Sequence, residues 1–218
     1  MNEFTTRQLA ENQHVQRVKL SLIQHAVILG GIVLVLWAVE VLDRMVFAGA
    51  LDLYGISPRT WVGLRNIAIS PFLHAGFGHL FANTLPLVVL GWLVMLRNTR
   101  DFFVVTFIAA VISGLGIWLF GASNTVHIGV SGVIFGYLGY LLWRGYLERS
   151  VVAIVLAVMA LFFYGGMLWG VLPGREGVSW LGHLFGFAGG MIAAYVVTER
   201  RPALTDLRVR QRSDVPYS

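Results

Sequence analysis

The run of residues 180–198 reads WLGHLFGFAGGMIAAYVVT and contains no charged side chain. At a rise of about 1.5 Å per residue, a helix of this length crosses most of the ~30 Å hydrocarbon core of a bilayer. Its glycines Gly182, Gly186 and Gly190 recur every four residues, so one face of the helix is smooth. The run is therefore typical of a membrane helix that packs closely against another helix.

A second apolar run supplies a matching small-residue face. It contains Gly129, Gly132 and Gly136, which we expect to pack against the smooth face of 180–198. Each run also carries one polar side chain near its start. Close contact between the two glycine faces would bring His183 towards Ser131.

The whole chain has the composition of a membrane protein. Hydrophobic residues make up 57% of its 218 residues and charged residues only 12%, whereas soluble domains carry about 25% charged residues. The mean hydropathy is +0.73. This composition, with no cysteine, excludes a disordered chain and a disulfide scaffold, and it is atypical of a soluble enzyme. We expect the lipid bilayer to be its solvent.

Six apolar runs are long enough, or nearly so, to span a bilayer. We therefore predict an all-α polytopic membrane protein with an N-terminal segment (1–22), a membrane domain (23–198) and a polar tail (199–218). The first outer loop, about 43–78, is long and apolar and is expected to fold. The predicted spans are 23–42, 79–96, 102–120, 129–143, 151–172 and 180–198.

The basic residues indicate topology and not a nucleic-acid partner. They are spread in ones and twos between apolar runs, unlike a phosphate-binding stripe. Twelve of the 16 fall in one alternate set of segments, 1–22, 97–101, 144–150 and 199–218. The positive-inside rule then places both termini in the cytoplasm. The compact chain favours a multi-pass protein of a bacterial inner membrane.

The predicted fourth span is short. Residues 129–143 would cover only about 22 Å as a helix, so its outer end would lie inside the bilayer. The preceding residues, from Gly121, must then enter the membrane as irregular backbone. Such backbone is tolerated where protein or a water-filled cavity surrounds it. The sequence thus predicts a hydrated pocket that opens to the extracytoplasmic side above this span.

Five polar side chains are expected at one depth on the outer side of three different spans: His74, His79, Asn83, Ser131 and His183. Four of them have a structural alternative. The serine could bond a carbonyl one turn back, the histidine of the last span could simply be packed, and His79 and Asn83 could form a polar clamp between helices. Their joint occurrence at one depth favours a functional site, because buried polar groups are costly in lipid.

Together these residues resemble the rhomboid intramembrane serine proteases. The matching pattern is His74-x4-His79-x3-Asn83, then Gly129-Val130-Ser131-Gly132, then His183 followed by Gly186 and Gly190. The resemblance implies a six-helix bundle and cleavage of transmembrane protein substrates. The chain departs from well-known bacterial members in three places: Phe135 replaces a tyrosine, Trp61 and Arg65 are not adjacent, and Gly182 stands where alanine is common.

The expected chemistry is that of a serine–histidine dyad. His183 would act as the base for Ser131, with Phe135 packed on the imidazole in place of an orienting carboxylate. The Ser131 N–H, His79 and Asn83 would stabilise the oxyanion. Supporting roles fall to His74, which would hold the first loop, and to Gly129, Gly132 and Gly186. No cofactor or metal is expected, and His127 receives no role.

Other functions fit the sequence less well. A catalytically inactive rhomboid-like protein that binds transmembrane helices is the main alternative, but it would be expected to lack Ser131 or His183. A transporter would need polar groups across the whole membrane, and a zinc protease would need a His-Glu-x-x-His motif, which is absent. Substrates would enter laterally beside the fifth span, where 162–167 form a gate or merely an aromatic belt facing lipid.

Overall fold

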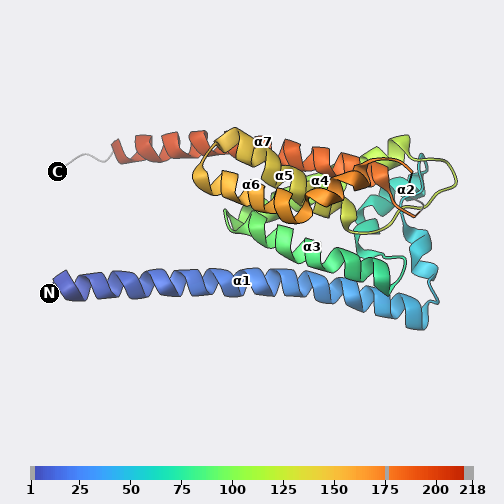
Figure 1. The fold of residues 1–218 in the computed structure, drawn as a ribbon, viewed down its shortest axis with the longest axis horizontal. Coiled ribbons are helices and arrows are strands. Elements are labelled where there is room, and N and C mark those ends of the chain that lie inside the picture. Colours follow the sequence, from blue (N-terminus) through green and yellow to red (C-terminus); the bar gives the residue numbers. More distant parts are fainter. Residues whose placement is uncertain (1–2, 175–176, 214–218) are drawn as a thin grey trace.

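The computed structural model describes residues 3–174 and 177–213, and every regular element within these ranges is a helix. The long helices run side by side along the longest axis of the molecule (Figure 1). They are α1 (Glu3–Val46), α3 (Phe77–Met95), α4 (Thr99–Phe120), α5 (Ser131–Glu148), α6 (Val151–Tyr164), which continues as the 3-10 helix η4 (Gly165–Val171), and α7 (Trp180–Ser213).

Within the described residues, five segments are long and apolar enough to cross a membrane: Val15–Val46, Phe77–Met95, Thr99–Phe120, Val151–Val171 and Trp180–Thr198. An all-helical, multi-pass membrane protein is therefore confirmed. Helix α5 corresponds to the predicted fourth span, but it is not among these five segments, so the count of six remains a prediction. The first described turn of α1 and the last described turn of α7 lie at the same end of the molecule (Figure 1).

Helix α5 lies at the centre of the bundle and packs against α3, α4, α6 and α7. Every residue from 132 to 141 is buried. Because protein rather than lipid surrounds it, α5 can carry polar side chains that a lipid-facing helix could not. Two fully buried tyrosines, Tyr137 and Tyr140, lower its hydropathy, and each finds a hydrogen-bond partner, in Thr106 and Asp101 respectively.

The contact between α5 and α7 is made by backbone. A Cβ atom added to Gly186 would lie 2.0 Å from the Gly132 carbonyl oxygen, and one added to Gly190 would lie 1.9 Å from the Gly136 oxygen. The predicted glycine packing is confirmed for these residues. It is wrong for Gly129, where an added Cβ would meet the His79 ring.

A buried ion-pair network ties the far end of α5 to α4. The Arg144 guanidinium lies 2.6 Å from Asp101, which also accepts from Tyr140, and Glu148 joins Arg144 to Arg97. Our assignment of Arg144 to a loop, with the span ending at 143, is wrong. The helix continues to Glu148 because the carboxylates neutralise the guanidinium and accept its N–H groups.

The first loop is an ordered cap at the opposite end of the molecule (Figure 1). It contains the short helices η1 (Ala50–Tyr54), α2 (Trp61–Arg65), η2 (Asn66–Ala68) and η3 (Ser70–Phe72). Ile56 exchanges two backbone hydrogen bonds with His127, of 2.8 and 3.1 Å, and this bridge joins the loop to the segment before α5. The expectation that this loop folds is confirmed.

The proposed terminal segments are not separate elements in the structure. Helix α1 runs through residue 22 without a break, and α7 runs through residue 198 to Ser213. The last part of the predicted tail, 214–218, lies outside the described residues. The division of the chain at 22 and 198 thus remains a prediction from hydropathy.

Candidate active site

Ser131 is the first residue of α5. Irregular backbone precedes it, as the short span predicted: Gly129 has φ +110°, and its N–H donates to the Ser70 carbonyl at 2.9 Å. This conformation is strained for any residue with a Cβ. The turn at Gly129 brings Ser131 to the helix start, where backbone N–H groups have no partner within the helix.

The hydroxyl of Ser131 meets the imidazole of His183 on α7. The Oγ–Nε2 distance is 2.9 Å. On the other side of the ring, His183 Nδ1 lies 3.0 Å from the Gly170 carbonyl oxygen. Because a carbonyl only accepts, Nδ1 carries the proton and Nε2 has a free lone pair. The Ser131 hydroxyl therefore donates to Nε2, which is the arrangement needed for a base that accepts the serine proton.

Phe135 stacks on the His183 ring. The ring centroids are 4.1 Å apart and the planes differ by 9°. The backbone of Gly170 comes so close that an added Cβ would lie 3.0 Å from the Phe135 ring and 3.2 Å from His183 Nδ1. The imidazole is thus held on one face by an aromatic ring and on one edge by a backbone carbonyl. Sequence reasoning found the phenylalanine but not the carbonyl.

The side chain of His79 lies beside Gly129. A Cβ added to Gly129 would be 3.4 Å from His79 Nε2 and 4.0 Å from Ser131 Oγ, so ring and hydroxyl border the same space. Asn83 is buried one turn along α3, and its Nδ2 donates to the His79 carbonyl oxygen at 3.1 Å. The structure therefore brings Ser131, His183 and His79 together, while the Asn83 amide is engaged on its own helix.

His74 supports the start of α5. The Val130 N–H points at His74 Nε2 at 3.5 Å, and the ring meets His79 edge-on, with centroids 5.2 Å apart. Burial, together with the nearby His79, lowers the pKa of His74 to about 4. The ring is therefore neutral at physiological pH and can accept. His74 also belongs to the first loop, since its carbonyl accepts from Arg44.

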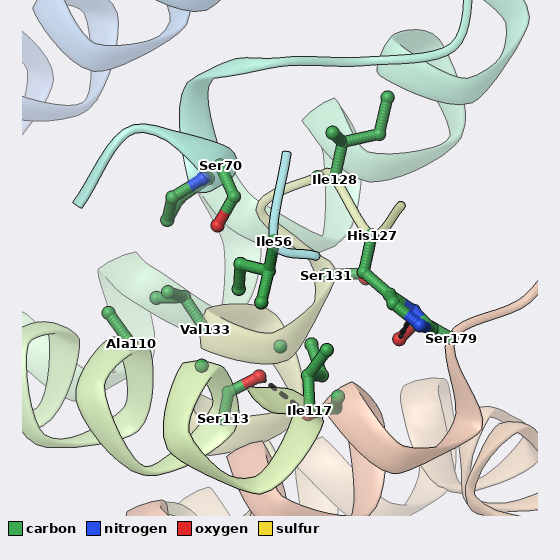
Figure 2. A pocket seen from close by; sticks show the side chains of 15 residues that line it. Ile56, Ser70, Ala110, Ser113, Ile117, His127, Ile128, Ser131, Val133 and Ser179 are labelled. Carbon is green, nitrogen blue, oxygen red and sulfur yellow. Dashed lines mark hydrogen bonds between the residues drawn. The ribbon is translucent and has the colours of Figure 1, made fainter. Parts of the chain in front are cut away.

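A small cavity of about 20 Å³ adjoins Ser131, between the first loop, α4, α5 and the start of α7 (Figure 2). Its polar lining consists of the hydroxyls of Ser70, Ser113, Ser131 and Ser179 together with His127. A cavity of this size holds about one water molecule, and hydroxyl and imidazole groups are suitable partners for it. A polar cavity is therefore present beside the start of α5, while its hydration and its opening to the extracytoplasmic side remain predictions.

Comparisons with known proteins agree with this geometry. A family model described as the rhomboid domain matches residues 62–200. The chain belongs to the rhomboid family. An uncharacterized protein of Mycobacterium tuberculosis, Rv1337, is 42% identical over 84% of this chain and 80% of its own length. An uncharacterized Mycobacterium leprae protein, ML1171, is 43% identical over 75% of this chain and 67% of its own length.

A plant member shares part of the same domain. RHOMBOID-like protein 4 of Arabidopsis thaliana is 34% identical over 59% of this chain and 33% of its own length. The matched family domain contains Ser131, His183, His79 and Asn83. It leaves out α1, which precedes it.

Proposed function

We propose that this rhomboid is an intramembrane serine endopeptidase that cleaves transmembrane protein substrates. The observation that carries the proposal is the 2.9 Å contact between Ser131 Oγ and the unprotonated Nε2 of His183. A hydroxyl is a weak nucleophile until a base accepts its proton, and this contact supplies that base. The family match supports the same class of protein.

The reaction follows from the proton positions. His183 Nε2 takes the Ser131 proton as Oγ attacks the carbonyl carbon of the scissile bond, which gives a tetrahedral oxyanion. The imidazolium then donates that proton to the leaving amine nitrogen as the C–N bond breaks. Water attacks the resulting acyl ester, passes its proton to His183, and releases the acid product while Ser131 regains its proton.

Three groups are suited to stabilise the oxyanion. The backbone N–H of Ser131 lies at the positive end of α5, and the His79 ring borders the same space. Asn83 is close along α3 but bonds the His79 carbonyl at 3.1 Å, so it would contribute by rotating towards the substrate. Removal of one such donor typically lowers the rate by about 10²–10³.

The Gly170 carbonyl takes the place of the carboxylate of a triad. When His183 becomes an imidazolium, its Nδ1–H already donates to this oxygen, so the new charge is partly stabilised without side-chain movement. Phe135 offers its face to the same cation. The sequence predicted that Phe135 packs on the imidazole where no carboxylate orients it, and the proposed dyad uses it in this way.

The membrane arrangement that we propose has α5 as a sixth span, sheltered inside the bundle. An even number of spans agrees with both described helix ends lying at one end of the molecule (Figure 1). The excess of basic residues supports a cytoplasmic location for that end, with Ser131 towards the extracytoplasmic side of a bacterial inner membrane. The mycobacterial relatives agree with a bacterial setting.

Substrates would reach the site from the side of α6 and η4. Phe162 and Phe163 are 80% and 66% exposed, and the same segment leads through η4 to Gly170 at the His183 ring. A helical peptide bond is shielded by its own hydrogen bonds, so a substrate segment must unwind near its outer end. Glycine and proline favour such unwinding.

The test is cleavage of a fluorogenic transmembrane substrate by the purified protein in proteoliposomes. Ser131→Ala and His183→Ala should lose nearly all cleavage, and a serine-directed phosphonate should label wild type but not Ser131→Ala. Ser113→Ala is a matched control, because Ser113 lines the same cavity but donates to the Gly182 carbonyl. Cleavage that persists in both dyad variants would refute the proposal. Binding without cleavage in wild type would favour the inactive helix-binding alternative.

A further inference from the structure

His127 is a half-buried histidine that the proposed chemistry does not use. Its Nδ1 lies 2.8 Å from Ser179 Oγ and its Nε2 lies 2.9 Å from Thr125 Oγ1. Its side chain and that of Ser179 line the cavity beside Ser131 and meet there (Figure 2). A histidine with both ring nitrogens engaged is held in one orientation.

The direction of each hydrogen bond follows from its neighbours. The Thr125 hydroxyl donates its single proton to the Ala122 carbonyl at 2.6 Å, so it must accept from His127 Nε2–H. Burial lowers the pKa of His127, which favours the neutral ring. Nδ1 is then unprotonated and accepts a hydrogen bond from the Ser179 hydroxyl. The chain of bonds therefore runs from Ser179 through His127 to Thr125.

This series of hydrogen bonds connects the two segments that carry Ser131 and His183. On one side, the backbone of His127 is fixed to Ile56 by two hydrogen bonds, and Ser131 follows four residues later. On the other side, the Ser179 carbonyl accepts from the His183 N–H at 3.1 Å, so Ser179 caps the first turn of α7. The glycine contacts join α5 and α7 deeper in the bundle, whereas His127 joins their outer ends.

We propose that His127 is a positioning residue that holds the start of α7, through Ser179, at the separation from α5 that keeps His183 hydrogen-bonded to Ser131. This inference rests on the proposed protease function and names a further residue on which that chemistry depends. Without the contact, the outer turn of α7 loses its side-chain link to the segment that precedes Ser131. A displacement of about 1 Å between reacting groups can lower a rate by about 10²-fold.

The first test compares variants in the proteoliposome assay. His127→Phe keeps ring volume without ring nitrogens, and Ser179→Ala removes the other partner. Each should lower kcat on the order of tenfold with little change in KM, and each should slow phosphonate labelling of Ser131 in proportion. The double variant should be no worse than the poorer single variant, because both remove one shared contact. His127→Asn, whose Oδ1 can accept from Ser179, should recover most of the activity.

His25→Phe is the matched control. Like His127, His25 bonds a hydroxyl, that of Thr99 at 3.1 Å, but it is buried on α1, outside the site. It should leave kcat unchanged. Unchanged kcat and labelling in both His127→Phe and Ser179→Ala would overturn the proposal. So would a lower KM with unchanged kcat, which would mean that the contact blocks substrate entry.

A second readout does not require activity. The ¹⁵N chemical shift of His183 Nε2, assigned with a His183→Gln reference, reports its hydrogen bond to Ser131. In His127→Phe this shift should move towards its value in Ser131→Ala, and a shift that stays at the wild-type position would refute the positioning role. If wild type neither cleaves nor reacts with the phosphonate, the protease proposal fails, while this measurement still decides the role of His127.

Discussion

At the scale of single residues, the imidazole of His183 is oriented without any charged side chain, as the proposed dyad requires. The Gly170 carbonyl fixes the tautomer, and the Phe135 ring fixes the plane at a centroid distance of 4.1 Å. Neither group carries a charge, so neither has to be desolvated as an ion inside the membrane. Orientation of the His183 ring thus comes from packing and one neutral hydrogen bond.

This arrangement makes Phe135 a sensitive position. Phe135→Leu should lower kcat by roughly 2- to 10-fold, because stacked ring pairs contribute about 0.5–1.5 kcal/mol. The measurement is the kcat of cleavage at saturating substrate. Phe102→Leu serves as the control, since Phe102 packs against Tyr137 in the buried cluster and does not contact His183. Equal losses in the two variants would mean that Phe135 acts only through stability.

The side chains around His183 were predictable and the carbonyl was not. A histidine or serine in an apolar run stands out because of its cost in lipid, and the glycine spacing indicated which helices approach each other. A backbone carbonyl such as that of Gly170 is present at every residue and leaves no mark in the sequence. His127 was visible, but its partner Ser179 is 52 residues away and only the fold joins them.

At the scale of helices, the contact between α5 and α7 sets the site. Gly186 and Gly190 bring the backbone of α7 against carbonyls of α5, which leaves no room for a methyl group. The same buried position explains why α5 is less apolar than the five other spans. Protein surrounds it, so it can carry Tyr137, Tyr140 and Arg144. Hydropathy alone therefore ended the predicted span at residue 143, whereas the helix continues to Glu148.

A methyl group at Gly190 should push the two helices apart. Gly190→Ala would place its Cβ 1.9 Å from the Gly136 carbonyl oxygen, so we expect a loss of stability of about 1–3 kcal/mol and a fall in kcat. Thermal unfolding in detergent and the cleavage assay check both effects. Gly30→Ala on α1, where nothing lies within 4 Å, should be neutral or slightly stabilising. Equal changes in stability and kcat in the two variants would contradict the role of the contact between α5 and α7.

At the scale of the whole molecule, polar groups gather at two places along the bundle. The first loop and the start of α5 surround the cavity with histidines and hydroxyls, while Arg144, Asp101 and Glu148 form the ion-pair network at the other end of α5. Breaking a buried pair of this kind typically costs about 3–5 kcal/mol. The central helix is thus anchored by charge at one end and by loop contacts at the other.

The buried, neutral His74 should make the stability of the folded protein depend on pH. Its folded pKa of about 4 lies below the ordinary value of 6.5, so between these values the unfolded state binds a proton that the folded state excludes. Stability should therefore fall by about 1.4 kcal/mol per pH unit from pH 6.5 towards pH 4 on account of this residue, with no such loss above 6.5.

Unfolding in detergent from pH 8 to pH 4 measures this dependence. His74→Gln, whose Oε1 can still accept from the Val130 N–H, should show a shallower decline than wild type. His127 has its pKa lowered by burial as well, so some decline should remain in the variant. Identical pH profiles for wild type and His74→Gln would rule out the contribution of His74.

The touching backbones of α5 and α7 carry an evolutionary consequence. Where two helices meet through carbonyls and α-carbons, no side-chain rotation can make room for a larger residue. Substitutions at Gly186 and Gly190 are therefore excluded for every larger amino acid. Diversification within the family must then occur elsewhere, in the first loop and along the largely exposed α6. The packing of α5 on α7 then stays constant, while the surfaces around it are free to change.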